Sequence, residues 1–383
     1  MKNILRICAL FLLLCLLPAC AENAANGSKR LHCSGVFSES GYYYAEYPSI
    51  LKYTDLSNGT TVYLCQKVGC NHTDPELCEA YIGSEGEKKL FFWNDGVYYQ
   101  VNDQHGTQLC RRNADGTGLS VVATLCKDYM EEDKEIDCKF QDGIILDGKL
   151  YYYTAVYAIV ETEPSIFTSE NIFDLINCVD LRTGKEETLV KKDGGRLHLA
   201  GIQDGVLYYE ETDMGDTSAE NYTDTMGELP SRLKRYNLST GETDTVFEKK
   251  LDDFRGLEAI IGSKVYYLDT TAEGKVYRCY DMKDGADTQI ATGHVTILNE
   301  RYLLRRSQNK DWDWELVDMQ KEKTLPCFFF GQRLSVMNMS DQGAVFDLKE
   351  YVDGKHTGKH TYFYASFQSL ADGIQEEDCV FFQ

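Results

Sequence analysis

The chain has 383 residues and a formal net charge of −22, and aromatic residues make up 12% of it, with 26 Tyr, 17 Phe and only 6 Pro. A surface this acidic repels anionic lipid headgroups and excludes nucleic acid as a partner. The aromatic content is typical of β-strands and excludes a largely disordered chain, and the length suits one large all-β domain or two ordinary ones.

Residues 1–19 have the pattern of a secretory signal peptide. Basic residues stand near the start, and the apolar run over 7–17 is too short to cross a bilayer as a helix. The sequence LPAC at 17–20 resembles the lipobox of bacterial lipoproteins, in which the Cys receives a diacylglycerol and becomes the new N-terminus. The resemblance implies lipidation of Cys20 and an anchor of two acyl chains. The alternative is an ordinary secretory signal in which Cys20 has no role.

A short polar tether follows the signal, over residues 20–33. It is rich in Ala, Asn, Gly, Ser and Lys, which is typical of a flexible linker. Loss of the signal removes Lys2 and Arg6 and no acidic residue, which brings the net charge to −24. We therefore expect residues 34–383 to form one monomeric body at the cell membrane, lipid-anchored and facing outside.

The body is periodic, because a tight Asp-Gly type of turn followed by a Tyr-rich strand recurs along it. This combination is a strong signal for a β-hairpin. Clear copies are DGVYY at 95–99, DGKLYYY at 147–153, DGVLYY at 204–209 and GSKVYY at 262–267. Weaker copies are SGYYY at 40–44, NERYLL at 299–304 and DQGAVF at 341–346.

A second element follows each copy, and it reads as a strand, a Gly-containing turn and another strand. Examples are KYTDLSNG at 52–59, CVDLRTG at 178–184 and RYNLSTG at 235–241. Four antiparallel strands that repeat every ~40–55 residues are typical of a propeller blade. The sequence therefore predicts an all-β fold, a β-propeller with seven blades of four antiparallel strands. A pair of β-sandwiches or a β-solenoid is the alternative.

The sharpest chemical cluster is formed by Cys65, Cys70, His72 and Cys78. Cys65 ends a predicted strand over 61–65, and the others lie in the loop before the next predicted strand at 90–93. Three thiols and one imidazole are a ligand set for a tetrahedral structural Zn²⁺. The alternatives are disulfides, such as Cys65 or Cys70 with Cys78, and free thiols.

Two further segments interrupt the repeat. The insertion 155–177 is rich in apolar residues, and its part 169–176 begins like a short capped helix. We expect the insertion either to cover its own blade or to lie over one end of the propeller as a lid that docks a partner. The segment 210–228 carries seven acidic residues and no basic one, which indicates either a cation-binding rim loop or a solvated loop.

Trp and Asp alternate over residues 311–314. In a strand this spacing sends Trp312 and Trp314 to one face and the two acids to the other. Exposed Trp rings can stack on sugars, so we name both as candidate ligand contacts, and packing between blades is the alternative.

The body holds an odd number of cysteines, so they cannot all pair within one chain. An exported protein with so many thiols implies disulfides, a metal or a reducing habitat. The eleven residues are Cys33, Cys65, Cys70, Cys78, Cys110, Cys126, Cys138, Cys178, Cys279, Cys327 and Cys379.

The Tyr-rich strands beside NADGTG at 113–118 resemble the blades of TolB-like and low-density-lipoprotein-receptor-like propellers. The chain is most similar to the lipid-anchored, Cys-containing propellers of clostridia and their relatives, over nearly its whole mature length. The resemblance implies the architecture, and it implies no particular activity, because those families mostly bind or scaffold.

The sequence lacks the short motifs of α/β-hydrolases, zinc proteases, dinucleotide enzymes, P-loop proteins and sialidases. We expect a non-enzymatic surface lipoprotein whose propeller binds a protein, a glycan or a small ligand at the envelope. One alternative is an exported glycan-acting enzyme with two or three acids within about 5–10 Å at one mouth of the central channel. Another is a structural member of an envelope complex.

Overall fold

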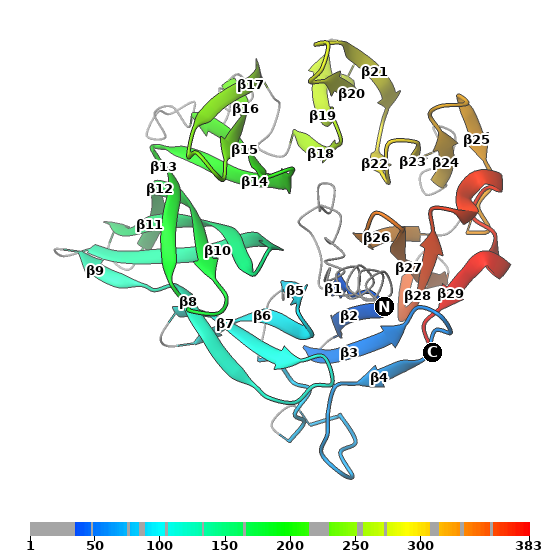
Figure 1. Ribbon diagram of the computed structural model, residues 1–383, viewed down its shortest axis with the longest axis horizontal. Helices are drawn as coiled ribbons and strands as arrows, with labels where there is room; N and C mark the ends of the chain where they lie inside the picture. The colour runs from blue at the N-terminus through cyan, green and yellow to red at the C-terminus, as the bar shows by residue number, and fades with distance from the viewer. Residues whose placement is uncertain are drawn as a thin grey trace, which may run out of the picture.

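The computed structural model describes residues 35–46, 49–74, 77–83, 89–103, 106–131, 134–163, 166–213, 230–250, 256–271, 274–306, 314–329, 333–352 and 355–383. Over these residues the strands form seven sheets that stand around a central axis (Figure 1). In each sheet the strands lie side by side in the order of the sequence. This confirms the predicted seven-bladed β-propeller.

The first three blades contain strands β1 to β13. Blade 1 is made of β1 (Gly35–Phe37), β2 (Gly41–Glu46), β3 (Ile50–Asp55) and β4 (Thr61–Tyr63). Blade 2 is made of β5 (Leu90–Trp93), β6 (Gly96–Asp103), β7 (Gly106–Asn113) and β8 (Ser120–Cys126). Blade 3 has a fifth strand and is made of β9 (Tyr129–Glu131), β10 (Lys134–Leu146), β11 (Lys149–Glu163), β12 (Ile166–Asp180) and β13 (Glu186–Asp193).

The last four blades contain strands β14 to β29. Blade 4 is made of β14 (Gly195–Gln203), β15 (Val206–Asp213), β16 (Pro230–Asn237) and β17 (Thr243–Lys250). Blade 5 is made of β18 (Leu257–Ile261), β19 (Lys264–Thr271), β20 (Gly274–Asp281) and β21 (Asp287–Thr292). Blade 6 is made of β22 (Val295–Ile297), β23 (Tyr302–Arg306), β24 (Trp314–Asp318) and β25 (Lys323–Leu325). Blade 7 is made of β26 (Arg333–Met339), β27 (Gly343–Val352), β28 (Lys355–Ser366) and β29 (Cys379–Phe381), with the short 3₁₀ helices η2 (Ser369–Asp372) and η3 (Glu376–Asp378) before β29.

The adjacent Tyr residues of the second strands pack on opposite faces of their blades. Successive side chains of a strand point to opposite faces, and a propeller blade is covered by a neighbour on each face. In β6, Tyr98 packs with Tyr152 between blades 2 and 3, whereas Tyr99 packs with Tyr43 between blades 1 and 2. In β11, Tyr151 packs toward blade 4 and Tyr152 toward blade 2. One Tyr of each pair therefore joins its blade to the next blade, and the other joins it to the previous one.

The buried Tyr hydroxyl groups find hydrogen-bond partners across these interfaces. Tyr43 Oη donates to the Ala114 carbonyl at 3.3 Å, and Tyr152 Oη donates to the Leu125 carbonyl at 3.1 Å. A buried hydroxyl without a hydrogen-bond partner would lower the free energy of unfolding. These two bonds remove that cost, so the Tyr side chains can be buried between the blades.

Two turns at the same end of each blade are joined by a backbone hydrogen bond. In blade 3, Asp147 and Gly148 form the first turn with φ of 50° and 75°, as a two-residue hairpin turn requires. The second turn begins at Asp180, whose Oδ1 accepts the Thr183 N–H at 2.9 Å, and the Leu181 N–H donates to the Gly148 carbonyl at 2.9 Å. The matching donors in the other blades are Leu56, Ala114, Leu238, Met282, Met319 and Phe367, and their acceptors are Ser40, Asp95, Gly205, Ser263, Arg301 and Gln342.

Among the described strands, the ring closes between blades 7 and 1 without exchange of a strand. Each sheet is built from one continuous stretch of chain, so side chains and single backbone bonds hold the closure. Asn338 Nδ2 donates to the Gly35 carbonyl at 2.7 Å, between the innermost strands of the two blades. The Gln383 N–H donates to the Gly59 carbonyl at 2.9 Å near the outer edge. The first and last blades accordingly lie side by side in Figure 1.

The predicted helix at 169–176 is wrong. These residues belong to β12, which pairs with β11 on one side and with β13 on the other, and the insertion forms a long hairpin. Pairing on both sides of the strand outweighs the local capping signal.

The strand predicted over 61–65 ends at Tyr63, so Cys65 lies in the following connection.

The signal, the tether and Cys20 lie outside the described residues, so the predictions for them are untested. Among the residues that the structure describes, no helix combines the length and hydropathy that a membrane span requires.

We predict that Tyr152→Ala lowers the free energy of unfolding by about 3–5 kcal/mol, because it opens a cavity between blades 2 and 3. Tyr129→Ala, at an exposed Tyr of β9, should change it by about 0.5 kcal/mol or less. Denaturant unfolding followed by Tyr fluorescence measures both variants. Equal losses would contradict the role of the Tyr pairs in joining the blades.

Candidate metal centre

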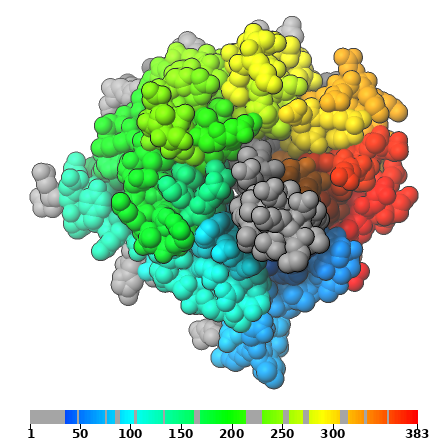
Figure 2. Space-filling model, in the orientation of Figure 1, coloured from blue at the N-terminus to red at the C-terminus, as the bar shows by residue number. Residues whose placement is uncertain are grey.

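The four residues of the Cys and His cluster lie in the connection between β4 and β5. In Figure 2 this part of the chain protrudes from the rim of the ring. Its returning half is tied to the start of β3, because the Leu51 N–H donates to the Ala80 carbonyl at 2.8 Å and the Ile82 N–H donates to the Ser49 carbonyl at 3.0 Å. These bonds fix the segment that carries Cys78 against blade 1.

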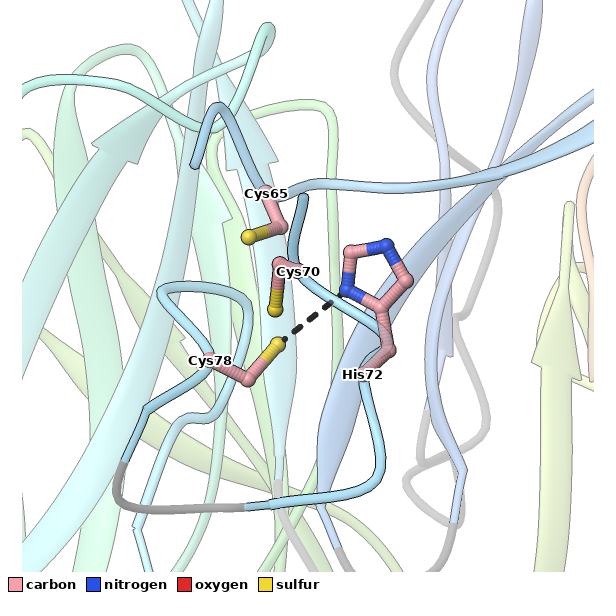
Figure 3. Close-up of side chains that lie close together, drawn as sticks. All are labelled: Cys65, Cys70, His72 and Cys78. Carbon is pink, nitrogen blue, oxygen red and sulfur yellow. Dashed lines mark hydrogen bonds between the residues drawn. The ribbon is translucent and has the colours of Figure 1, made fainter. Parts of the chain in front are cut away.

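Two tight turns bring the later cysteines back toward Cys65. The Cys70 N–H donates to the Lys67 carbonyl at 3.2 Å, and the Cys78 N–H donates to the Asp74 carbonyl at 3.0 Å. Each turn reverses the chain, so that both thiols face the thiol at the end of the first blade. Figure 3 shows the three sulfur atoms gathered in one place, with the imidazole ring beside them.

The candidate ligand atoms of Cys65, Cys70, His72 and Cys78 all lie within 4.8 Å of one another. His72 Nδ1 is 3.4 Å from Cys78 Sγ (Figure 3). A tetrahedral zinc site requires separations of about 3–4 Å between ligand atoms, so a small inward shift would complete the geometry. All three cysteines are free thiols in the structure, and His72 faces the sulfur atoms, which is not the arrangement that the disulfide alternative requires.

The imidazole is held in place by an aromatic neighbour. The rings of His72 and Tyr63 stack with their centroids 4.2 Å apart and their planes 16° apart. Tyr63 is the last residue of β4, so the blade itself orients the ring. A ligand that is fixed before the metal arrives loses less conformational freedom on binding.

The thiols differ in their readiness to ionise. Burial raises the pKa of Cys78 to about 11. Burial also acts to raise the pKa of Cys65, but hydrogen bonds from the backbone N–H groups of Lys67, Glu79 and Ala80, together with one from the Cys70 thiol, hold that pKa below its usual range. Backbone donors therefore favour a thiolate at Cys65, and metal binding would have to displace the proton of Cys78.

The structure describes only one of the two Trp residues that are candidate ligand contacts. Trp314, the first residue of β24, is half-buried and packs against the hydrophobic core of blades 6 and 7, and the Arg306 guanidinium lies 5.6 Å from its ring centroid. Trp312 lies outside the described residues. Stacking of these rings on a sugar stays a prediction.

The acidic segment 210–228 starts inside a strand and not in a rim loop. Glu210 and Glu211 are buried in β15. Lys234 Nζ, on the neighbouring strand, donates to Glu211 Oε2 at 3.0 Å, and Arg232 Nη1 donates to Asp213 Oδ2 at 2.7 Å. Glu211 and Asp213 are therefore neutralised by basic residues of β16, whereas Glu210 accepts a hydrogen bond from the Ser231 hydroxyl. Residues 214–228 lie outside the described residues.

Sequence reasoning missed a histidine pair in blade 7. Lys349 pairs with His360, whereas Tyr351 pairs with His356, so β28 bulges between the two histidines and brings their ring centroids to 5.0 Å. His360 Nδ1 lies 3.0 Å from both carboxylate oxygens of the buried Asp347. The pattern HTGKH, with its central Gly, was the signal that could have found this pair.

A cavity of about 400 Å³ opens at the turn end of blades 5 to 7. Its lining combines the charged side chains of Glu300, Arg301 and Asp341 with Ile261 and Phe367.

In the described part of the chain, the Cys and His cluster is the one group of three or more His, Cys, Asp or Glu residues that converge closely enough to hold a metal.

No protein-family model matches the sequence, and no curated protein matches it. Among solved structures, the chain is similar to an oligogalacturonate lyase in complex with manganese, at 12% identity and a TM-score of 0.48, over 91% of each chain. It is also similar to TolB from Acinetobacter baumannii, at 11% identity and a TM-score of 0.38, over 87% of this chain and 75% of that one. A chain of a nidogen/laminin complex is 12% identical with a TM-score of 0.37, over 78% of this chain and 92% of that one. These similarities concern the propeller fold alone.

We predict that protein purified without oxygen contains about one zinc ion per chain, bound by the three thiols and the imidazole. Cys70→Ser should lose the metal, because it removes one of four ligands. Cys178→Ser is the matched control, since Cys178 is a buried thiol in blade 3, outside the cluster. Elemental analysis of the three proteins decides the matter, and equal zinc contents in the two variants would contradict the assignment.

Proposed function

We propose that the chain is a non-enzymatic, lipid-anchored surface protein whose propeller binds an envelope protein or glycan, and that a structural zinc ion shapes one of its contact surfaces. Cys65, Cys70, His72 and Cys78 would hold the ion. Three sulfur donors and one nitrogen donor fill a tetrahedral zinc site and leave no open position for a substrate, which supports a structural role.

The connection that carries the cluster has few apolar anchors of its own. Its small buried core consists of Ile50, Cys78 and Ala80, with the half-buried Cys65, Cys70 and Tyr81 against it. Three of these six residues are candidate ligands. When bound, the ion would therefore cross-link the loop where a larger protein would use a hydrophobic core.

One observation carries the binding role of this surface. Large apolar side chains are exposed on the connection that carries the cluster and on the strand before it: Val68 is fully exposed, Leu77 is 58% exposed, and Val62 and Tyr63 on β4 are exposed as well. Exposed apolar side chains that gather in one area mark interaction surfaces more often than scattered ones do. We call Val62, Tyr63, Val68 and Leu77 the rim patch.

The proposed anchor sets how far the propeller can stand from the membrane. Cys20 lies fifteen residues before Gly35, the first residue of β1. A chain of that length spans about 50 Å at most when fully extended. The rim patch would thus remain within reach of partners at the cell envelope.

We predict that Cys20→Ser releases the mature protein from the membrane fraction or leaves its signal uncleaved, because the acyl chains that anchor it are not added. Fractionation of the producing cells, with mass determination of the N-terminus, measures this. Mature Cys20→Ser protein that still sediments with membranes would contradict the lipid anchor.

We predict that a photo-reactive amino acid at position 68 forms adducts with an envelope protein or glycan in intact cells. The same photo-reactive amino acid at position 352 is the control. Val352 is exposed too, at 57%, but it lies on blade 7, outside the rim patch. Mass spectrometry of the adducts identifies the partner. Equal labelling from both positions would count against the rim patch as a binding surface, and loss of position-68 adducts in Cys70→Ser would support a role of the metal in shaping it.

A further inference from the structure

A second pair of sulfur atoms meets where blade 2 ends and blade 3 begins. Cys126 is the last residue of β8 and is only 5% exposed, whereas Cys138 lies in β10 and is half-buried. Both side chains belong to the same hydrophobic contact region, which fills the interface between the two blades. Both are free thiols in the structure.

The backbone between the two cysteines holds them together. The chain leaves β8 and turns back through the hairpin of β9 and β10, in which Tyr129 pairs with Ile136. The Cys138 N–H donates to Asp128 Oδ1 at 2.9 Å, so the hairpin closes next to Cys126. The Cys126 and Cys138 side chains hydrogen-bond to each other. β8 and β10 belong to different sheets, so the two side chains meet across the interface between blades 2 and 3, and a disulfide there would join the two blades.

The environments of the two thiols are unequal. The hydrogen bond from Cys126 is the largest influence on Cys138, and with the Lys127 backbone N–H it lowers the pKa of Cys138 against the effect of burial. The same contact and burial raise the pKa of Cys126. Since the thiolate is the reactive form, the more exposed Cys138 is the thiol that reacts first with an oxidant.

We propose that Cys126 and Cys138 are a redox-active pair that closes into a disulfide between blade 2 and the root of the long hairpins of blade 3. The oxidant is a low-molecular-weight disulfide. The Cys138 thiolate attacks the oxidant and forms a mixed disulfide, which releases one thiol of the oxidant. Cys126 then gives up its proton and attacks the Cys138 sulfur, which releases the second thiol. Two thiols of the protein become one disulfide, and the disulfide of the oxidant becomes two thiols.

The experiment treats the folded mature chain, loaded with zinc, with oxidised glutathione and maps its tryptic peptides. We expect the peptide 113–127, which carries Cys126, to be joined to the peptide 135–139, which carries Cys138. The joined pair should be about 2 Da lighter than the sum of the free peptides. Cys178 is the internal control, because it is a buried thiol opposite Tyr151 and should stay reduced.

Two variants separate the roles of the cysteines. Cys126→Ser should trap glutathione on Cys138, with a gain of about 305 Da, because the resolving thiol is missing. Cys138→Ser should leave Cys126 unmodified, since that thiol is buried. The proposal is overturned if the joined peptide forms only after denaturation, or if Cys126→Ser gains no glutathione while its circular dichroism spectrum matches that of the wild type.

Discussion

The packing of adjacent Tyr side chains on opposite faces of blades 1 to 5 is the constraint on which the rest of the structure depends. Because a strand alternates its side chains, two neighbouring large residues can both be buried only if both faces of the sheet are covered. Tyr98 and Tyr99 meet this condition by packing against different blades. Repetition of the same pair along the chain requires a neighbour on both sides of every such blade, and a closed ring provides it for all of them. The joined turns of each blade then fix where its second and third strands begin and end.

These contacts hold the blades to one another but not the connections between them, which need contacts of their own. The connection after β4 is long and has only a small buried cluster of its own, and the connection after β8 adds the extra strand β9 before it enters blade 3. At both places sulfur atoms converge, and a metal ion or a disulfide bond would act there as a cross-link that does not depend on core size. The two proposals therefore share one physical cause.

Sequence reasoning could predict the blades because their signals are local and repeated, and it could predict the cluster because Cys65 to Cys78 lie within one loop. It failed where distant strands decide the outcome. The residues 169–176 carry a helix-start signal, but pairing with two strands overrides it. The sequence predicts that Glu211, in an acidic segment, is exposed to solvent. The structure instead places Lys234 of the neighbouring strand beside it. Cys126 and Cys138 lie close together because of a hairpin whose register no local sequence pattern predicts.

The central claim is that the loop after β4 is built around a metal ion with three sulfur ligands and one nitrogen ligand. X-ray absorption spectroscopy at the zinc edge of protein purified without oxygen tests it most directly. The account predicts three sulfur neighbours at about 2.3 Å and one nitrogen neighbour at about 2.0–2.1 Å from the zinc. A first shell dominated by oxygen, or zinc-free protein in which two of these cysteines share a sulfur–sulfur bond of about 2 Å, would contradict it.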